Sequence, residues 1–82
     1  MSFPEEIAKG CFSITPNDST TFTDNAFGIY VGGDGDVKVD TLDGDEVTFS
    51  GAKAGTTLPV IATKVYATGT TATNLLGYRE PR

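Results

Sequence analysis

The sequence predicts an all-β fold, a small antiparallel β-sandwich or barrel of about six short strands with little or no helix. The chain of 82 residues contains 13 Thr and 10 Gly, and β-branched residues favour strands whereas Gly favours turns. Turn signals recur about every 8–12 residues, a spacing typical of small sandwiches and barrels. No segment is long enough for the helix of a parallel crossover, so neighbouring strands should be antiparallel.

Short apolar and β-branched runs, separated by Gly, Asn, Asp and Pro, define the elements in order. An N-terminal arm (residues 1–10) contains one marginal helical turn at residues 4–9, where Pro4 occupies a first-turn position. A single β-domain (residues 11–79) follows, and residues 80–82 form a C-terminal tail. The expected strands are residues 11–15, 26–31, 36–41, 46–50, 58–68 and 74–79.

Residues 37–49 form the clearest local unit, a β-hairpin whose register can be derived. A three-residue loop at 42–44 separates an apolar face from a polar face, whereas a two-residue turn would mix them. It also places Gly44 at a left-handed position, where Gly meets no steric penalty. The loop aligns four pairs: Val39 with Val47, Val37 with Phe49, Lys38 with Thr48, and Asp40 with Glu46.

In the run 58–68, apolar and polar residues do not alternate regularly. Val60, Ala62 and Tyr66 fall on one side, and Ile61, Val65 and Ala67 on the other. A strand that is apolar on both faces is covered on both faces, and a chain of this size has a thin core of its own. We therefore expect another chain to cover it. The residues predicted for this subunit or partner interface are Leu58, Val60, Ile61, Val65, Tyr66, Tyr30 and Tyr78.

Composition excludes several classes of function. The net charge of −5 disfavours binding to nucleic acid or to anionic membranes. The chain has no His and one Cys, which removes the usual general base and the common zinc ligands. We predict a protein that is not an enzyme and that needs no metal or cofactor. Glu5 and Glu6 stand where a signal peptide needs positive charge, so folding in the cytoplasm is expected.

Two motifs have alternative interpretations. The acids Asp34, Asp36, Asp40, Asp43, Asp45 and Glu46 suggest a calcium site, but their spacing fits neither an EF-hand loop nor a nonapeptide calcium repeat. We interpret them as turn and edge residues. The Gly-rich segment 32–35 precedes a strand rather than a helix, which favours a tight turn over a phosphate-binding loop.

Two kinds of side chain could also bind or react. Cys11, with no His in the chain to activate it, is predicted to be a packing residue of the core or an interface. The aromatic side chains are spread over the strands and could form a sugar-stacking platform, but packing is favoured. They are Phe12, Phe22, Phe27, Tyr30, Phe49, Tyr66 and Tyr78.

Three segments together resemble a known family. They are TPNDST at residues 15–20, IYVGGDGDVKV at 29–39, and a segment that begins AGTTLPV at 54–60 and ends VYATGTTAT at 65–73. A Val-Thr-Phe strand at 47–49 lies between the second and the third. The order is similar to that of the small spike-base and surface proteins of tailed phages and gene transfer agents, over roughly residues 13–78.

This resemblance implies a non-enzymatic virion structural protein, a head-surface spike-base or decoration protein. Such a protein would assemble as a trimer or pentamer in the host cytoplasm and reside on the virion surface. Its partners would be the major capsid protein or another virion protein, and a spike or tail fibre. Two alternatives stay open: a tail or baseplate component, and a carbohydrate-binding module that recognises the host surface through an exposed platform such as Tyr30 or Tyr66.

Overall fold

The computed structural model describes residues 10–79, so the expected helical turn at residues 4–9 and the tail at 80–82 lie outside the described residues. Residues 10–79 contain strands and no helix, and hence no helix that could cross a membrane. The strands are β1 (Cys11–Ser13), β2 (Ala26–Val31), β3 (Gly35–Thr41), β4 (Glu46–Ala52), β5 (Thr56–Val65) and β6 (Leu76–Tyr78). The all-β prediction is confirmed, with its largest boundary error at the end of β5.

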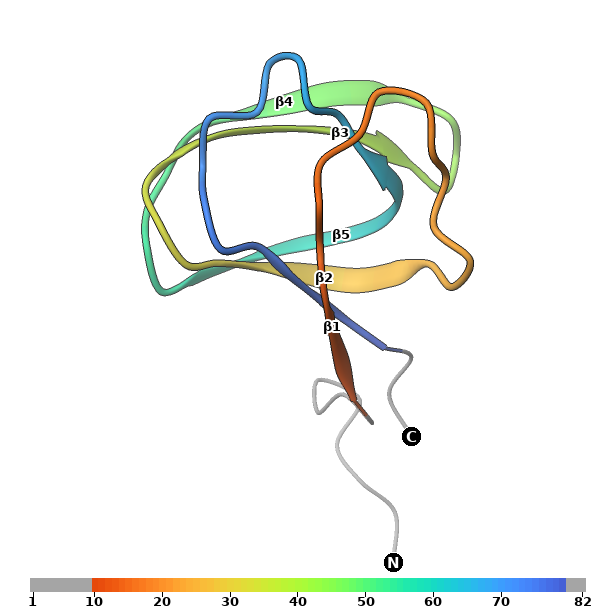
Figure 1. The fold of residues 1–82 in the computed structure, drawn as a ribbon, viewed down its shortest axis with the longest axis horizontal. Helices are drawn as coiled ribbons and strands as arrows, with labels where there is room; N and C mark the ends of the chain where they lie inside the picture. Colours follow the sequence, from red (N-terminus) through yellow and green to blue (C-terminus); the bar gives the residue numbers. More distant parts are fainter. Residues whose placement is uncertain (1–9, 80–82) are drawn as a thin grey trace, which may run out of the picture.

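All six strands belong to one antiparallel sheet in the order β1-β6-β2-β5-β3-β4. The sheet curls so that β3 and β4 lie opposite β2, while β5 joins the two sides (Figure 1). The segment 66–74 completes the curl, because it runs from β5 along β3 and then enters β6. The backbone amides of Tyr66 and Thr71 donate to the carbonyls of Lys38 and Asp36, each at 2.8 Å. The architecture is therefore a barrel-like curled sheet with β1 and β4 at its edges.

Threonine hydroxyls support this closure where the segment 66–74 meets β3. The hydroxyl of Thr70 accepts a hydrogen bond from the amide of Lys38 at 3.0 Å, and that of Thr71 accepts one from the amide of Asp36 at 2.9 Å. These side chains satisfy backbone donors that a regular strand partner would otherwise satisfy. The Thr-rich sequence of this segment thus follows from its position.

Glycines allow the closing segment to approach the start of β3. A Cβ at Gly32 would lie 2.5 Å from the carbonyl oxygen of Asn74, and a Cβ at Gly35 would collide with the backbone of Ala72. Gly33 forms a β-bridge with Thr73 between them. The Gly-rich segment is therefore a crossing point of two backbones as well as a turn.

The hairpin register is confirmed in all four predicted pairs. Gly44 has the predicted positive φ, 97°. Burial differs between the two strands, since Val37 and Val39 of β3 are fully buried while Val47 of β4 is 38% exposed. Because β4 is an edge strand, it extends beyond the core that covers β3.

The core contains twelve buried apolar residues from β2 to β5 and from the segments next to β1 and β6: Ile14, Ala26, Ile29, Val31, Val37, Val39, Ala52, Leu58, Ala62, Val65, Ala72 and Leu75. Phe12, Phe22, Phe49 and Val60 pack against it from partly buried positions. These residues fill the space that the curled sheet encloses in Figure 1.

The prediction for residues 58–68 holds for Ala62 and Ile61, which lie on opposite faces of β5, but it was wrong for Val65. Asp40 of β3 pairs with Lys64, but the next residue, Thr41, pairs with Ala62, so Thr63 is an extra residue in β5. A bulge of this kind reverses which side chains face inward. Ala62 and Val65 consequently both face the core, with exposures of 0% and 1%. Val65 therefore lies on the same face as Ala62 and not, as alternation predicted, on the face of Ile61.

Candidate interaction surfaces

An uncharged surface lies on the outer side of β2, β5 and β6, and we call it the aromatic face. Register places its members together, because Phe27 pairs with Ile61 and Tyr30 pairs with Leu76. None of these side chains carries a charge at neutral pH. All are half-buried except the exposed Pro59. The aromatic face consists of Phe27, Tyr30, Pro59, Ile61, Leu76 and Tyr78.

Tyr78 fixes the centre of the aromatic face. A Cβ at Gly28 would lie 3.1 Å from the Tyr78 ring, so the ring covers the backbone of β2 at this point. Gly28 has a φ of 103°, and the β2–β5 register shifts here. The Tyr78 hydroxyl lies 3.4 Å from the hydroxyl of Thr57. The face is thus formed by neighbouring strands and does not depend on a mobile loop.

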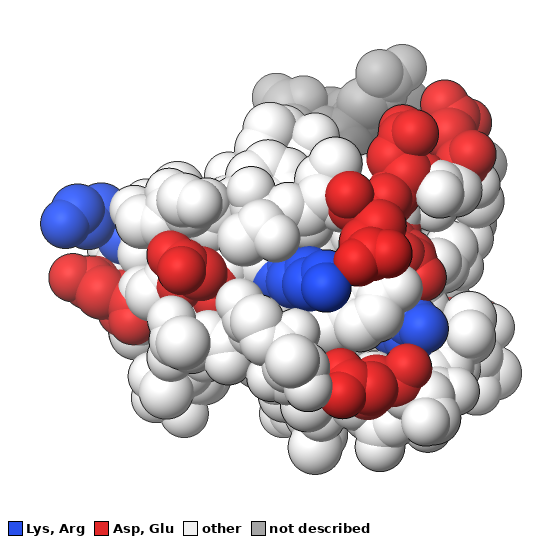
Figure 2. Space-filling model, turned by 90° about the horizontal axis from the view of Figure 1, so that it is seen from above, with Lys and Arg blue, Asp and Glu red and all other residues white. Residues whose placement is uncertain are grey.

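A second surface on the outer side of β3, β4 and β5 is charged, and we call it the charged face. Tyr66 lies at its centre, with the Lys38 and Lys64 ammonium groups 4.8 and 4.4 Å from its ring centroid. Lys38 pairs with Glu46 at 2.8 Å, and Lys64 lies 3.6 Å from Asp40. Figure 2 looks down on the β3–β4 side of the molecule and shows acidic side chains around a few basic ones.

Hydrogen bonding on the charged face shifts two pKa values. The Tyr66 hydroxyl donates to the Asp40 carboxylate at 2.9 Å, which raises the pKa of Tyr66 to about 12. The hydrogen bond to Glu46 raises the pKa of Lys38. Tyr66 and Lys38 therefore stay protonated to a higher pH than an ordinary Tyr or Lys. The charged face is therefore a network of satisfied pairs rather than a reactive site.

The acidic residues of the turns accept backbone hydrogen bonds. The Asp34 carboxylate accepts one from the amide of Ala54 at 2.7 Å, and the Asp36 carboxylate accepts one from the amide of Gly51 at 2.9 Å. Within the described part of the chain, no three His, Cys, Asp or Glu side chains gather as metal ligands would. Asp34 and Asp36 therefore stabilise the turns through these hydrogen bonds.

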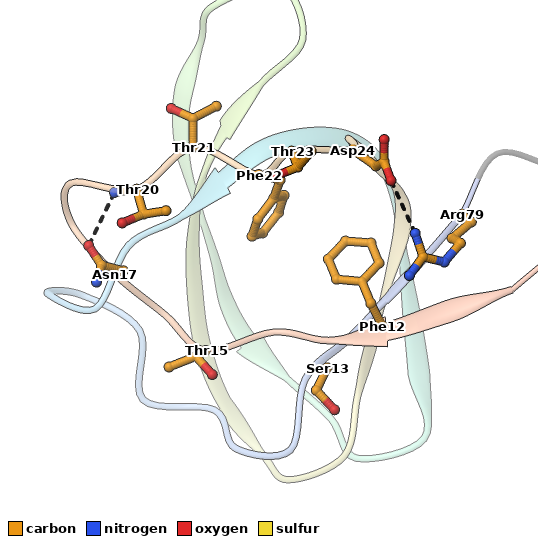
Figure 3. A pocket seen from close by; sticks show the side chains of 10 residues that line it. All are labelled: Phe12, Ser13, Thr15, Asn17, Thr20, Thr21, Phe22, Thr23, Asp24 and Arg79. Atoms are coloured by element: carbon orange, nitrogen blue, oxygen red, sulfur yellow. Dashed lines mark hydrogen bonds and ion pairs between the residues drawn. The ribbon is translucent and has the colours of Figure 1, made fainter.

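An open pocket of about 450 Å³ lies between β1, the loop that precedes β2, and Arg79 (Figure 3). The rings of Phe12 and Phe22 meet edge to face at its base, with centroids 5.4 Å apart. Arg79 pairs with Asp24 at 3.2 Å on the rim, and its guanidinium lies 5.3 Å from the Phe12 ring. Hydroxyl and amide side chains complete the wall: Ser13, Thr15, Asn17, Thr20, Thr21 and Thr23.

The two edge strands expose further surface. Among residues 10–79, no strand pairs with the outer edge of β4 or of β1. Beside the β4 edge, Val47 is 38% exposed and Leu42 of the hairpin loop is 55% exposed. On β1, Cys11 is exposed, so of the two predicted roles, packing in the core was wrong and packing at an interface stays a prediction.

The structure separates the residues predicted for an interface. Tyr30, Ile61 and Tyr78 meet on the aromatic face, and Tyr66 lies on the charged face. Leu58 and Val65 are 6% and 1% exposed and belong to the core of this chain, because the bulge at Thr63 turns Val65 inward; they are withdrawn from the interface. Val60 packs against the same core.

Pro59 and Leu76 were missed by the sequence reasoning, and Phe27 was named only among the aromatic side chains of a sugar-stacking platform. Phe27 and Tyr30 are three positions apart, so strict alternation would place them on opposite faces. The irregularity at Gly28 brings both to the outer side. An isolated Gly inside a strand pattern was the available signal, since it often marks a bulge.

Comparison with solved structures relates this chain to a virus-like particle. No protein-family model and no curated protein matches the sequence. A chain in a solved structure, the capsid of a native gene transfer agent (GTA) particle computed with C5 symmetry, is 35% identical to this chain. The match covers 90% of this chain and 86% of that chain, with a TM-score of 0.80. This chain belongs to the family of that GTA capsid component.

Membership in this family supports the resemblance in its broader form, that of a phage or gene transfer agent virion protein. The match extends over most of both chains, with a TM-score of 0.80. The relationship is therefore one between whole domains rather than between shared turns.

Proposed function

We propose that this chain is a non-enzymatic structural protein of a virion head, a spike-base or decoration protein. It assembles as a trimer or pentamer, docks on the capsid and supports a spike or fibre. The observation that carries the proposal is the match to the GTA capsid component, at 35% identity over 90% of this chain. Since that relative belongs to a capsid, a head location is favoured over a tail or baseplate.

The aromatic face supports a docking role. Interface centres are enriched in Tyr and Phe and depleted in charged residues. Tyr30, Ile61 and Tyr78 provide such a surface, whereas Lys38, Lys64, Asp40 and Glu46 lie on the charged face. Burying apolar area contributes roughly 25 cal/mol per Å². We assign the aromatic face to contact with a capsid protein.

The symmetry of the relative's particle supports an oligomer. That capsid was computed with C5 symmetry, and any protein that surrounds a fivefold axis is repeated five times. A ring of five copies would multiply the contribution of each modest docking face through avidity.

Co-purification with particles tests the proposal. An epitope-tagged chain should sediment with purified particles from the cells that encode it, in a fixed number of copies. Tyr30→Glu should fold but lose incorporation, because it places a charge at the docking face. Ser19→Glu, which adds the same charge in an exposed loop, should incorporate like the unmodified chain. A tagged, folded chain that never sediments with particles would overturn the proposed function.

A further inference from the structure

We propose that β4 of one copy pairs with β1 of the next copy, so that the sheets of neighbouring subunits become continuous. The inference rests on the proposed function in one respect, namely that the chain forms a ring. It adds the surfaces that join the subunits. The partner is a second copy of this chain, and the contact is separate from the aromatic face.

The β4 edge has the properties of a strand that accepts a partner. It spans seven residues, Glu46–Ala52, and no described strand covers its outer edge. Natural proteins protect such edges with Lys, Pro, inward charges or short length. β4 contains neither Lys nor Pro, and Glu46 is its single charged residue. The register with β3 shifts between Phe49 and Ala52, where β4 has an extra residue, and such a bulge interrupts an edge. The regular part of β4, residues 46–49, is therefore the template for backbone hydrogen bonding with another chain.

The side chains of β4 and β1 match face by face. On β4, Val47 and Phe49 pair with Val39 and Val37 and therefore lie on the core side. On β1, Phe12 also lies on the core side, where it pairs with Gly77. Joining the two edges would place apolar side chains of one copy beside those of the next.

The outer faces of these strands match in the same way. Thr48 and Ser50 of β4 are exposed, as are Cys11 and Ser13 of β1. All four side chains are small and uncharged, so they would not repel one another when the two strands pair. Strand register depends on such agreement, since a shift of one residue would place polar side chains against apolar ones.

The pocket between Phe12 and Phe22 provides a site for apolar side chains of the next copy. It opens beside β1 (Figure 3), and its aromatic base is apolar. The hairpin that ends in β4 carries Leu42 and Val47, the exposed large apolar side chains of the described chain. Arg79 on the pocket rim and Glu46 on β4 have opposite charges, and each side chain is about half exposed.

A second copy is favoured over other occupants because each chain carries both halves of the contact. An interface between two different patches is heterologous, and it closes into a ring when the rotation between copies allows it. Pairing of β4 with β4 would instead give a twofold dimer. The experiment separates these two arrangements.

Cys11 supplies a natural reporter, because it is the single Cys of the chain and lies on β1. Directly paired residues have Cα atoms about 4.5–5.5 Å apart, within the range of a disulfide. Thr48→Cys and Ser50→Cys, made separately, should give covalent multimers on mild oxidation. Peptide mapping should identify links from Cys11 to the introduced residue. Ser19→Cys, in an exposed loop, is the matched control and should give no ladder of multimers.

The same substitutions in a Cys11→Ser background should give no link. A link that persists there joins two β4 strands and overturns the proposed pairing in favour of a twofold dimer. Val47→Glu should fold like the unmodified chain and weaken self-association by about tenfold or more; unchanged association would also overturn the inference.

The two proposals fail in different ways. If the chain is present in particles but neither the particles nor the free protein give the Cys11 link, the strand pairing is wrong and the proposed function stands. If the chain is absent from particles but the link forms in solution, the pairing stands and the proposed function is wrong. If the chain neither enters particles nor forms the link, both are wrong.

Discussion

The Asp18 carboxylate accepts hydrogen bonds from both the backbone amide and the hydroxyl of Thr68, at 2.9 and 2.7 Å. A third bond, from the amide of Ala67, is 2.9 Å long. These bonds lower the pKa of Asp18, with the Thr68 amide as the largest cause. Asp18 and Thr68 belong to two of the segments that carry the family resemblance. Those segments therefore hold each other in place.

Asp18→Asn should lower the melting temperature more than Asp43→Asn. An amide offers one acceptor oxygen and its NH₂ group opposes the donors of Thr68, whereas Asp43 is an exposed turn residue. The two substitutions remove the same charge, so the comparison isolates the hydrogen bonds. Thermal unfolding followed by circular dichroism measures the difference. Equal losses would show that the Asp18 contacts contribute no more than a turn residue.

The pH dependence of Asp18 provides a second readout. A carboxyl with a lowered folded pKa stabilises the fold fully above its unfolded pKa, near 4, and this stabilisation is lost as the pH falls through the folded pKa. The stabilities of the unmodified chain and Asp18→Asn should converge in acid. Denaturant unfolding at a series of pH values checks this. A gap that stays constant would contradict the assigned cause.

Gly35→Ala should damage folding more than Gly51→Ala. Both residues have positive φ, 154° and 67°, but a Cβ at Gly35 would collide with the backbone of Ala72, whereas nothing lies within 4 Å of one at Gly51. Overpacking of this kind costs roughly 1–3 kcal/mol or more, beyond backbone strain. Free energies of unfolding measure the difference. Similar values would mean that barrel closure tolerates a side chain at this crossing point.

Gly44→Val should destabilise the protein more than Asp43→Ala. Gly44 has a φ of 97° and no heavy atom within 4 Å of an added Cβ, so its cost is backbone strain, about 1–2 kcal/mol. Asp43→Ala changes a solvated side chain beside it. Denaturant titration of the two variants compares them. A larger loss for Asp43→Ala would contradict the derived role of this loop.

Tyr66 should remain protonated until the pH approaches about 12, because its hydroxyl donates to Asp40. A group with a raised folded pKa stabilises the fold fully below its unfolded pKa, near 10, and this stabilisation is lost as the pH rises through about 12. Tyr66→Phe should therefore reduce stability near neutral pH and show a flatter alkaline limb. Tyrosinate absorbance of the two proteins identifies the late titration. Its persistence in Tyr66→Phe would assign it to another tyrosine.

Local sequence patterns predicted the hairpin because its loop and its alternation depend on neighbouring residues. Val39 and Val47 pair as expected, and Gly44 has the expected backbone. The presence of each strand was predictable for the same reason, because it also depends on neighbouring residues. The burial of Val47 was not, because exposure depends on which strand lies at the sheet edge, and this is decided by contacts between distant segments.

The surfaces were harder to predict because they depend on irregularities in the strands. The extra residue Thr63 in β5 returned Val65 to the core, and the irregularity at Gly28 brought Phe27 to the outer side with Tyr30. Each change reverses the alternation on which a face assignment rests. Tyr30, Ile61 and Tyr78 were predicted for an interface, and their grouping on one side of the sheet required the strand order.

Cryo-electron microscopy of particles from cells with and without the gene for this chain tests the central claim most directly. We expect density on the head surface that is present with the gene, absent without it, and fitted by the curled sheet in three or five copies with the aromatic face toward the capsid. Heads that are identical in the two samples, together with no peptides of this chain in the purified particles, would contradict a structural role on the virion head.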